Sequence, residues 1–191
     1  ILPTHAYLDP DFWDGVRAHG INFLYVVPPI ASLLVKECPS PSIPFTLDDL
    51  LCVAGSARLD PEIQRRFQDR FAPLANIYGL SECGFAFLFG QRRGDRFDNS
   101  VGPAVGLELR LLDADGDAIT VPGVQGRLQV RTPSLFEGYL HQPELTRRAV
   151  QDGWLDTNDL AWFDEEGCTH VIGRVDGTIK KAGNLFHLVE C

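Results

Sequence analysis

The sequence predicts an α/β domain with a mostly parallel, covered sheet, followed by a small antiparallel β-barrel. In the first half, continuous apolar runs alternate with helical patterns, which is typical of parallel strands covered by helices on both faces. Near residue 90 the pattern changes to short segments of alternating apolar and polar residues, separated by Gly and Pro. Such segments are typical of antiparallel barrels and sandwiches.

Three helices are expected in the first half. At the start of the first helix, Asp9 can act as the N-cap and Pro10 suits the first turn. Asp60 and Pro61 are expected to play the same roles in the third helix. The predicted helices cover residues 9–20, 30–37 and 60–71.

Three strands are expected between these helices. Each is a continuous apolar run, which indicates burial on both faces of a sheet. Pro28-Pro29 stops the first run and Gly55 ends the second. The predicted strands cover residues 23–27, 50–54 and 74–78.

The second half begins with a polar loop at residues 91–100 and continues with shorter elements. Period-2 alternation predicts two strands joined by a connection that turns at Asp115-Gly116, and a short helix and a hairpin follow. The strands cover residues 107–112 and 127–131, the helix 144–150, and the hairpin 160–171 with its turn at 164–167.

Composition excludes several classes of protein. Of 191 residues, 45% are hydrophobic and 23% charged, as in an ordinary globular protein. A net charge of -9 opposes binding to nucleic acid or to an anionic membrane surface. We see neither a signal peptide nor an apolar run of membrane-spanning length. Because the chain begins at Ile1 and contains no Met, we expect a fragment of a longer protein.

The five cysteines predict neither disulfides nor a zinc site. Their number is odd, their spacing is wide, and no C-x-x-C occurs. Reduced thiols in a cytoplasmic protein are the simplest interpretation.

The most informative motif is Ile77-Tyr78-Gly79-Leu80-Ser81-Glu82, at the carboxyl end of the third predicted strand. Ligands bind at such strand ends in open α/β sheets. A flat aromatic ring can stack on adenine, and a hydroxyl beside a carboxylate supplies oxygen ligands for Mg²⁺. The alternative is a tyrosine packed at a turn beside a solvated Glu.

Two further motifs follow in order: Gly153-Trp154-Leu155-Asp156-Thr157-Asn158-Asp159, then the segment from Gly173-Arg174-Val175-Asp176 to Gly183. Together the three motifs resemble those of the AMP-forming adenylating enzymes, which include acyl-CoA synthetases, benzoate ligases, luciferases and peptide-synthetase adenylation domains. The resemblance covers nearly the whole chain. An unrelated protein with chance matches is disfavoured, because order and spacing agree across all three motifs.

The resemblance implies a nucleotide site. It assigns Tyr78 and Gly79 to adenine, and the small-residue turn Gly55-Ser56-Ala57 to the wall of the adenine and substrate pocket. Ser81 would contact phosphate, and Glu82 would hold Mg²⁺.

The second motif would bind the ribose. Its final residue, Asp159, would accept hydrogen bonds from both ribose hydroxyls, and Arg174 would also reach the ribose. Asn158 stands where the family usually has Gly, and Asn is among the residues that best tolerate positive φ. The alternative for Asp159 is a surface Asp in a hairpin.

The third motif resembles the hinge of the family. Asp176 would be the pivot of a domain rotation, Gly183 would line the thiol tunnel, and Lys180 would act in the second half-reaction. The alternative is a basic solvated turn.

Two quieter segments are expected to be structural and to have no part in the chemistry. Gly126-Arg127-Leu128 matches a G-E-L strand of the family with Arg in place of Glu, and residues 136–140 match its G-Y turn. The acid is expected to contact Cys83, Gly84 and Phe85, where small residues beside Phe favour an apolar or aromatic substrate.

The resemblance also implies a division of the chain into three parts. Residues 1–95 would form the α/β part with the adenine and Mg²⁺ motif, 96–173 the barrel, and 174–191 the hinge and the start of a C-terminal domain. The family's phosphate loop and C-terminal catalytic Lys do not occur in these 191 residues, so we expect this fragment alone to be inactive.

The function implied is an ATP-dependent ligase of a carboxylic acid and a thiol, which forms an acyl-AMP and transfers the acyl group to CoA. Leu80 and Gly153-Trp154-Leu155 favour the acyl-CoA ligase type, because peptide-synthetase domains usually have Pro and Tyr-Arg there. The expected cofactors and partners are ATP/AMP, Mg²⁺, a small carboxylic acid, and CoA or the phosphopantetheine of a carrier protein. Two alternatives stay open: an acyl-AMP ligase that loads a carrier protein, and an inactive nucleotide-binding or interaction homologue. The sequence does not indicate an oligomeric state.

Overall fold

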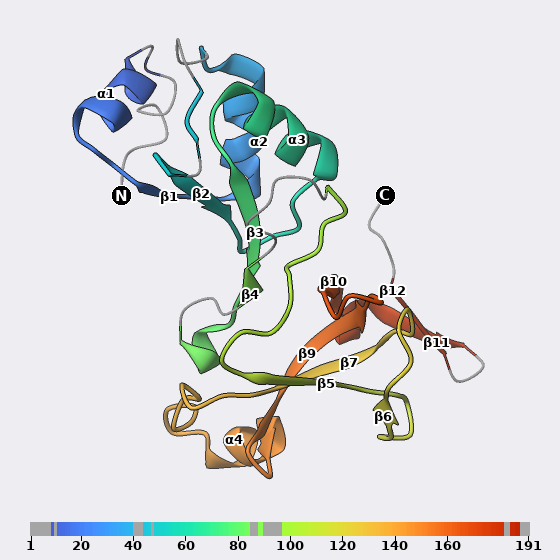
Figure 1. The fold of residues 1–191 in the computed structure, drawn as a ribbon. Helices are drawn as coiled ribbons and strands as arrows, with labels where there is room; N and C mark the ends of the chain where they lie inside the picture. Colours follow the sequence, from blue (N-terminus) through green and yellow to red (C-terminus); the bar gives the residue numbers. More distant parts are fainter. Residues whose placement is uncertain are drawn as a thin grey trace. The chain divides into compact units, whose positions relative to one another are not determined.

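The computed structural model describes residues 9, 11–39, 44–46, 48–84, 88–89, 97–181 and 184–187, with the backbone alone at 88–89, 177–181 and 184–187 (Figure 1). The chain forms two compact units. Unit 1 contains residues 1–78 and 89–100, and unit 2 contains residues 79–88 and 101–191.

Unit 1 is built on a sheet with the strand order β1-β2-β3-β4. Strands β1 and β2 are parallel, as are β2 and β3, with Tyr25 opposite Val53 and Val53 opposite Ala75. The predicted parallel sheet is therefore confirmed. The strands cover Phe23–Val26 (β1), Leu51–Ala54 (β2), Leu74–Tyr78 (β3) and Leu88–Phe89 (β4).

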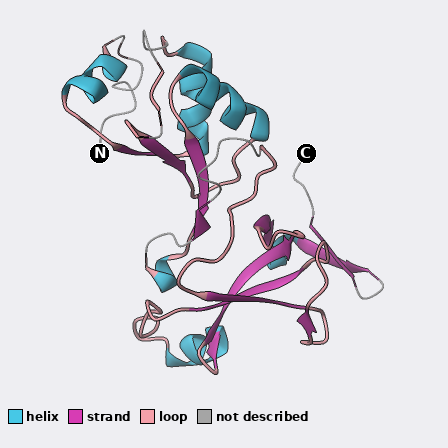
Figure 2. Ribbon diagram, in the orientation of Figure 1, coloured by secondary structure: helices cyan, strands magenta, loops and turns pink. Residues whose placement is uncertain are grey.

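Helices accompany this sheet, as the ribbon coloured by secondary structure shows (Figure 2). They cover Phe12–Ala18 (α1), Pro28–Glu37 (α2) and Pro61–Arg70 (α3). Helix α2 begins two residues earlier than predicted, because Pro28 and Pro29 occupy its first turn, where proline needs no hydrogen-bond donor. Asp60 caps α3 by accepting hydrogen bonds from the backbone N–H groups of Glu62 and Ile63, at 2.8 and 3.2 Å.

Aromatic rings fill the core of unit 1. The ring of Trp13 stacks on that of Phe71 with centroids 4.9 Å apart, and it meets Phe67 edge-on at 6.2 Å. All three side chains are almost fully buried, as is Leu34 of α2. Burial on this scale provides the main stabilisation of the unit.

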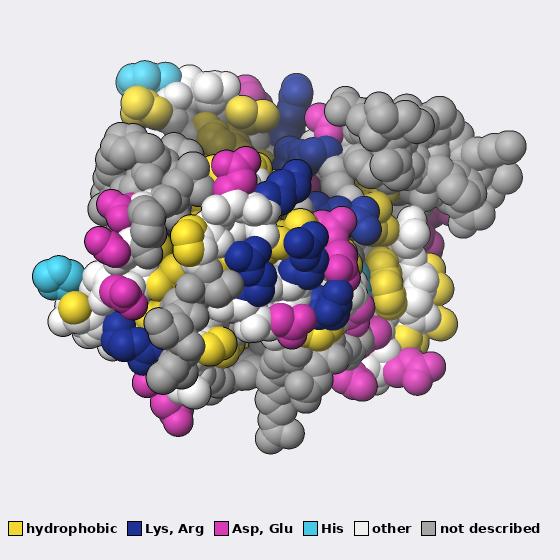
Figure 3. Space-filling view, turned by 90° about the horizontal axis from the view of Figure 1, so that it is seen from above, with side chains coloured by type: hydrophobic (Ala, Val, Ile, Leu, Met, Phe, Trp, Pro, Cys, Tyr) yellow, Lys and Arg dark blue, Asp and Glu magenta, His cyan; other side chains and the backbone are white. Residues whose placement is uncertain are grey.

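Charged side chains cover the outside. Figure 3 shows a face on which Lys and Arg side chains gather beside Asp and Glu side chains. On α3, Arg65 pairs with Glu62 at 2.7 Å and with Asp69 at 3.1 Å. Since the charge of Arg65 is balanced within the same helix, we do not interpret this residue as part of a phosphate-binding surface.

Unit 2 contains an antiparallel sheet with the order β10-β9-β7-β5-β6, and β8 pairs with β9. The predicted antiparallel architecture is confirmed as a curled half-barrel. Its strands cover Glu108–Leu112 (β5), Ala118–Ile119 (β6), Gly126–Arg131 (β7), Val150–Gln151 (β8), Trp154–Phe163 (β9) and Thr169–Arg174 (β10). The same unit also contains the short helices η2 (Ser81–Cys83) and α4 (Pro143–Ala149).

Three strands of unit 2 differ from the prediction. Strand β9 begins at Trp154, six residues before the expected hairpin, so the second motif forms part of a strand. After the single 3-10 turn η3 (Val175–Gly177), strands β11 (Thr178–Lys181) and β12 (Asn184–His187) form a two-stranded hairpin where a connecting segment was expected. None of the described helices has the length and apolar character needed to cross a membrane.

Candidate functional site

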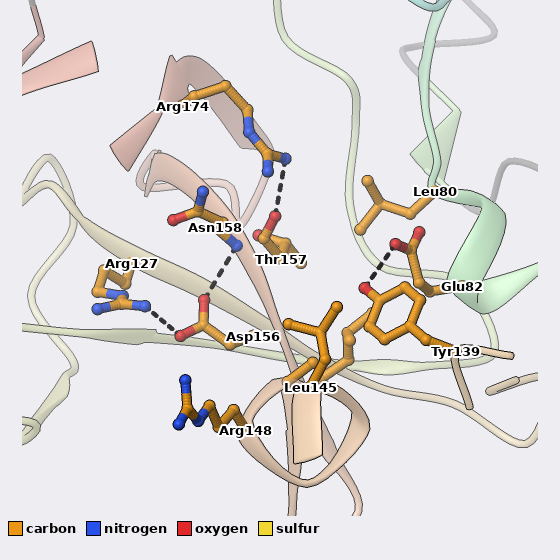
Figure 4. A pocket seen from close by; sticks show the side chains of 12 residues that line it. Leu80, Glu82, Arg127, Tyr139, Leu145, Arg148, Asp156, Thr157, Asn158 and Arg174 are labelled. Carbon is orange, nitrogen blue, oxygen red and sulfur yellow. Dashed lines mark hydrogen bonds and ion pairs between the residues drawn. The ribbon is translucent and has the colours of Figure 1, made fainter. Parts of the chain in front are cut away.

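A pocket of about 300 Å³ lies within unit 2 (Figure 4). Its walls come from the start of η2, strands β7 and β9, helix α4 with the turn before it, and the end of β10. Charged and polar side chains face apolar ones across it. The lining residues are Leu80, Glu82, Arg127, Tyr139, Leu145, Arg148, Ala149, Leu155, Asp156, Thr157, Asn158 and Arg174.

A bulge in β9 shapes one wall of this pocket. On β7, Arg127 pairs with Leu160 and Gln129 pairs with Asp156, so one residue of β7 faces three residues of β9. The three residues of β9 that lie between the two pairs are Thr157, Asn158 and Asp159. Asn158 has φ +58°, the conformation that the family's usual Gly adopts freely and that Asn tolerates better than most residues.

Asp159, the predicted ribose ligand, is only 6% exposed. Its backbone N–H donates to Thr157 Oγ1 at 3.1 Å, and the same hydroxyl donates to the carbonyl of Leu128 at 2.8 Å. The side chain of Thr157 thus ties the bulge to Leu128 of β7. The structure does not place Asp159 on an open hairpin surface, which was the alternative for this residue.

Arg174 lies opposite Asp159 in the pairing of β9 with β10. Its Nη1 donates to the carbonyl of Thr157 at 3.0 Å and lies 3.5 Å from Asp159 Oδ1. Because Arg174 is half-exposed while the carboxylate is buried, the guanidinium partly balances a charge that would be costly to bury alone. The two predicted ribose-binding residues are therefore neighbours.

Glu82 lies on another wall of the pocket. The phenol of Tyr139 donates to Glu82 Oε1 at 2.8 Å, and the backbone N–H of Phe136 donates to the Glu82 carbonyl at 2.7 Å. Burial raises the pKa of the Tyr139 phenol, and the hydrogen bond to Glu82 raises it further. Tyr139 therefore stays a neutral donor at physiological pH.

Cys83 does not line the pocket as expected. It is 1% exposed and packs in a small core with Val130 and Leu155. Burial, with a smaller effect of the Glu82 charge, raises the pKa of its thiol to about 11. The substrate-contact prediction for Cys83 is wrong because its side chain turns into the core, and Phe85 lies outside the described residues.

Arg127 forms an ion pair with Asp156 on the neighbouring strand. The resemblance puts a Glu of the family at the position of Arg127. The positive charge that Arg127 brings instead is balanced by Asp156 across β7 and β9.

Of the remaining nucleotide candidates, Gly79 and Ser81 belong to unit 2, and the others belong to unit 1. A Cβ atom on Gly55 would lie 2.8 Å from Ile77 Cγ1, so no larger residue fits there without a shift. Ser56 has φ +72°, and its hydroxyl lies 2.7 Å from the phenol oxygen of Tyr25. These two residues and Ala57 follow β2, and Tyr78 ends β3, the adjacent parallel strand, so both candidates lie at the carboxyl edge of one sheet.

The third motif is described in part. Asp176 lies in η3, and its Oδ1 is 3.9 Å from Arg174 Nε. The backbone of Lys180 belongs to β11, while its side chain and the whole of Gly183 lie outside the described residues.

Sequence reasoning missed several pocket residues, above all Tyr139 and Arg148. Tyr139 is 57 positions away from Glu82 in sequence, and no local pattern links them. The G-Y turn was the available signal, and it was interpreted as structural.

Comparison with known proteins gives consistent matches. The model of the AMP-binding enzyme family matches residues 1–140. Probable CoA ligase CCL9 of Humulus lupulus is 31% identical over 185 residues, covering 94% of this chain and 34% of that protein. The 3-hydroxybenzoate–CoA ligase of Aromatoleum sp. (strain CIB) is 35% identical over 168 residues, covering 88% and 32%.

A solved structure of ATP-bound MatB from Rhodopseudomonas palustris superposes with a TM-score of 0.77. It is 29% identical and is matched over 94% of this chain and 36% of that one. The chain spans about a third of the length of the curated relatives it matches.

Proposed function

Because this chain belongs to the AMP-binding enzyme family, we propose that it is the nucleotide-binding part of an ATP-dependent acid–CoA ligase. The observation that carries the proposal is the pairing of Asp159 with Arg174, because Arg174 lines a pocket that also contains Glu82. A carboxylate that accepts two hydrogen bonds suits a ribose diol, and the arginine can donate to the same group. The two CoA ligases reported above support the assignment.

Glu82 fits a role as a ligand of Mg²⁺. Its carboxylate faces the pocket, and within the described part of the chain no hydrogen bond reaches its Oε2. Oxygen ligands of this kind are those that Mg²⁺ prefers. When bound, Mg²⁺ would neutralise charge on the phosphates of ATP.

The proposed reaction has two steps. A carboxylate oxygen of the acid attacks the α-phosphorus of ATP, the bond from that phosphorus to the bridging oxygen breaks, and pyrophosphate leaves. The sulfur of CoA then attacks the acyl carbon and loses its proton, and AMP leaves with the electrons of the broken acyl–oxygen bond. The residues of this chain would contribute by positioning and by charge balance.

The other predicted roles are part of the same proposal. Tyr78 and Gly79, with the Gly55-Ser56-Ala57 turn, would contact adenine, and Ser81 would contact phosphate. Asp176 would be the pivot, and Lys180 and Gly183 would serve the thiol step. A cytoplasmic location and the use of CoA rather than a carrier protein likewise belong to the proposal.

Two departures from the family pattern, at Arg127 and Asn158, are accommodated in the fold. Arg127 is paired with Asp156, and Asn158 adopts the positive φ that the bulge requires. Neither substitution therefore argues against a working nucleotide site.

The test is calorimetric binding of AMP to the full-length protein. We expect Asp159→Ala to abolish binding, because it removes the buried carboxylate, while Asp115→Ala on the exposed β5–β6 turn leaves it unchanged. Pyrophosphate release with CoA is then screened over aromatic and short aliphatic acids. A folded full-length protein that binds no AMP, or binds it equally well as Asp159→Ala, would contradict the proposal.

A further inference from the structure

The G-Y turn before α4 carries an inference that extends the proposed function. The turn runs through Gly138 and Tyr139, which the sequence alone indicated to be structural. In the structure it aims one phenol at one carboxylate, that of Glu82 (Figure 4). The other contacts of the turn show whether the hydrogen bond between Tyr139 and Glu82 is incidental.

The phenol is held in place by three contacts. The Tyr139 ring packs edge-on against Phe136 with centroids 4.8 Å apart, and its backbone N–H donates to Thr146 Oγ1 at 2.9 Å. Gly138 has φ +151°, and a Cβ atom there would lie 2.9 Å from Thr146 Cγ2. The turn therefore approaches α4 too closely for a side chain at position 138, and Tyr139 has little freedom to move.

Glu82 is held by the same segment. Its carbonyl accepts a hydrogen bond from the Phe136 N–H, so backbone and side chain of Glu82 are both tied to residues 136–139. Its neighbour Cys83 is anchored in the core beside Leu155. One carboxylate oxygen is occupied by the phenol, and the other is left for a ligand.

The chemistry of the donor matters. An ionised carboxylate only accepts hydrogen bonds, so Tyr139 must be the donor. Unlike an Arg or Lys partner, a phenol orients the carboxylate without cancelling its negative charge. Groups that hydrogen-bond to metal-binding carboxylates typically fix their orientation in this way.

We propose that Tyr139 is a positioning residue, whose phenol fixes the Glu82 carboxylate so that Oε2 is presented to a divalent cation that accompanies the nucleotide. This inference rests on the proposed function, because it takes Glu82 as the cation ligand. It assigns the turn a part in metal binding, beyond joining β7 to α4.

The probe is Mn²⁺, titrated into the full-length protein with one equivalent of a non-hydrolysable ATP analogue and followed by the electron paramagnetic resonance of free Mn²⁺. We expect Tyr139→Phe to weaken Mn²⁺ binding by about tenfold or more, the usual loss when the partner of a metal ligand is removed. AMP binding without metal should be unchanged, because the phenol donates to Glu82, which is proposed to bind the cation and not the ribose. Phe preserves the ring packing on Phe136, and a thermal melt checks that the variant is folded.

Thr132→Val is the matched control. It removes a hydroxyl from the loop just before residues 136–139, which accepts from the Ser134 N–H at 3.2 Å, and it leaves the hydrogen bond to Glu82 in place. Wild-type Mn²⁺ affinity is expected for this variant. An equal loss of Mn²⁺ affinity in both variants would mean that any disturbance of this region weakens cation binding. That result overturns a specific role for the phenol.

Two other outcomes separate the inference from the proposed function. Wild-type Mn²⁺ affinity in Tyr139→Phe, with loss of Mn²⁺ in Glu82→Gln, overturns the role of Tyr139 and leaves the metal role of Glu82 intact. Wild-type affinity in Glu82→Gln overturns both roles, whereas the nucleotide site is judged independently by AMP binding to Asp159→Ala.

Discussion

The left-handed backbone of Asn158 gives the sharpest prediction about the site. Its φ is +58°, and its backbone N–H donates to Asp156 Oδ1 at 2.9 Å. Its side chain makes no hydrogen bond to the described residues. Substitution therefore changes the conformational preference of this position while the backbone contact persists.

The expected cost follows from the backbone conformation. A residue other than Gly, Asn or Asp costs about 1–2 kcal/mol in the left-handed region, and a β-branched residue is the least tolerated. We expect Asn158→Val to destabilise β9 by at least this amount. Asn158→Gly should be close to neutral, because relief of strain is offset by the greater entropy of the unfolded chain.

The assay is amide hydrogen exchange of β9 in the full-length protein. A cost of about 1–2 kcal/mol corresponds to exchange about 5–30-fold faster in Asn158→Val than in wild type. AMP affinity should fall in the same variant, since Asp159 is the next residue. If the Val and Gly variants exchange at the same rate, the bulge does not require positive φ, and the reasoning fails.

Three further predictions concern the same unit. Arg174→Gln should weaken AMP binding about tenfold, because a charged hydrogen bond beside Asp159 is lost, and calorimetry measures the change. Arg127→Glu should destabilise the sheet by about 1 kcal/mol by placing two carboxylates across β7 and β9, and Arg127→Glu combined with Asp156→Arg should recover most of the loss in a thermal melt. Burial raises the pKa of the Cys83 thiol from 9.0 to about 11. The neutral thiol therefore stabilises the fold fully below pH 9.0, and this contribution is lost as the pH rises through about 11. Melting temperatures of wild type and Cys83→Ala across this pH range measure it.

Each of these has a defined contrary result. Arg66→Gln, on an exposed face of α3, is the control for Arg174→Gln, and equal AMP affinities in the two variants would contradict the ribose role. Additive losses in the Arg127 and Asp156 double variant would show that the two charges do not interact. A Cys83→Ala protein that loses stability with pH as steeply as wild type would exclude the thiol as the source.

The elements of unit 1 were predictable because local signals agree with the fold. Strand β3 has the predicted bounds, and the Asp60 cap and Pro61 start α3 as expected. The start of α2 was misplaced because Pro28 and Pro29 both end a strand and begin a helix. Proline is disfavoured in the interior of a helix but is tolerated in its first turn.

Unit 2 was predicted less well, for two physical reasons. Burial alternates along the first half of β9, but the polar residues Thr157 and Asp159 take buried positions, so the sequence there shows no period-2 pattern of apolar residues. The contact between Glu82 and Tyr139 joins segments far apart in sequence, and the packing of Phe136 in the cluster around Cys83 helps to bring them together. Asp159 and Arg174 were found individually as candidates, while their cross-strand pairing came from the structure.

The long strand β9 has a thermodynamic consequence for any ligand of the pocket. It is hydrogen-bonded to β7 along one edge and to β8 and β10 along the other, and its bulge is tied to β7 through Thr157. The backbone around Asp159 therefore loses its conformational entropy when the protein folds. A ligand that binds there orders little further chain, so the entropy of association reflects mainly the ligand and its displaced water.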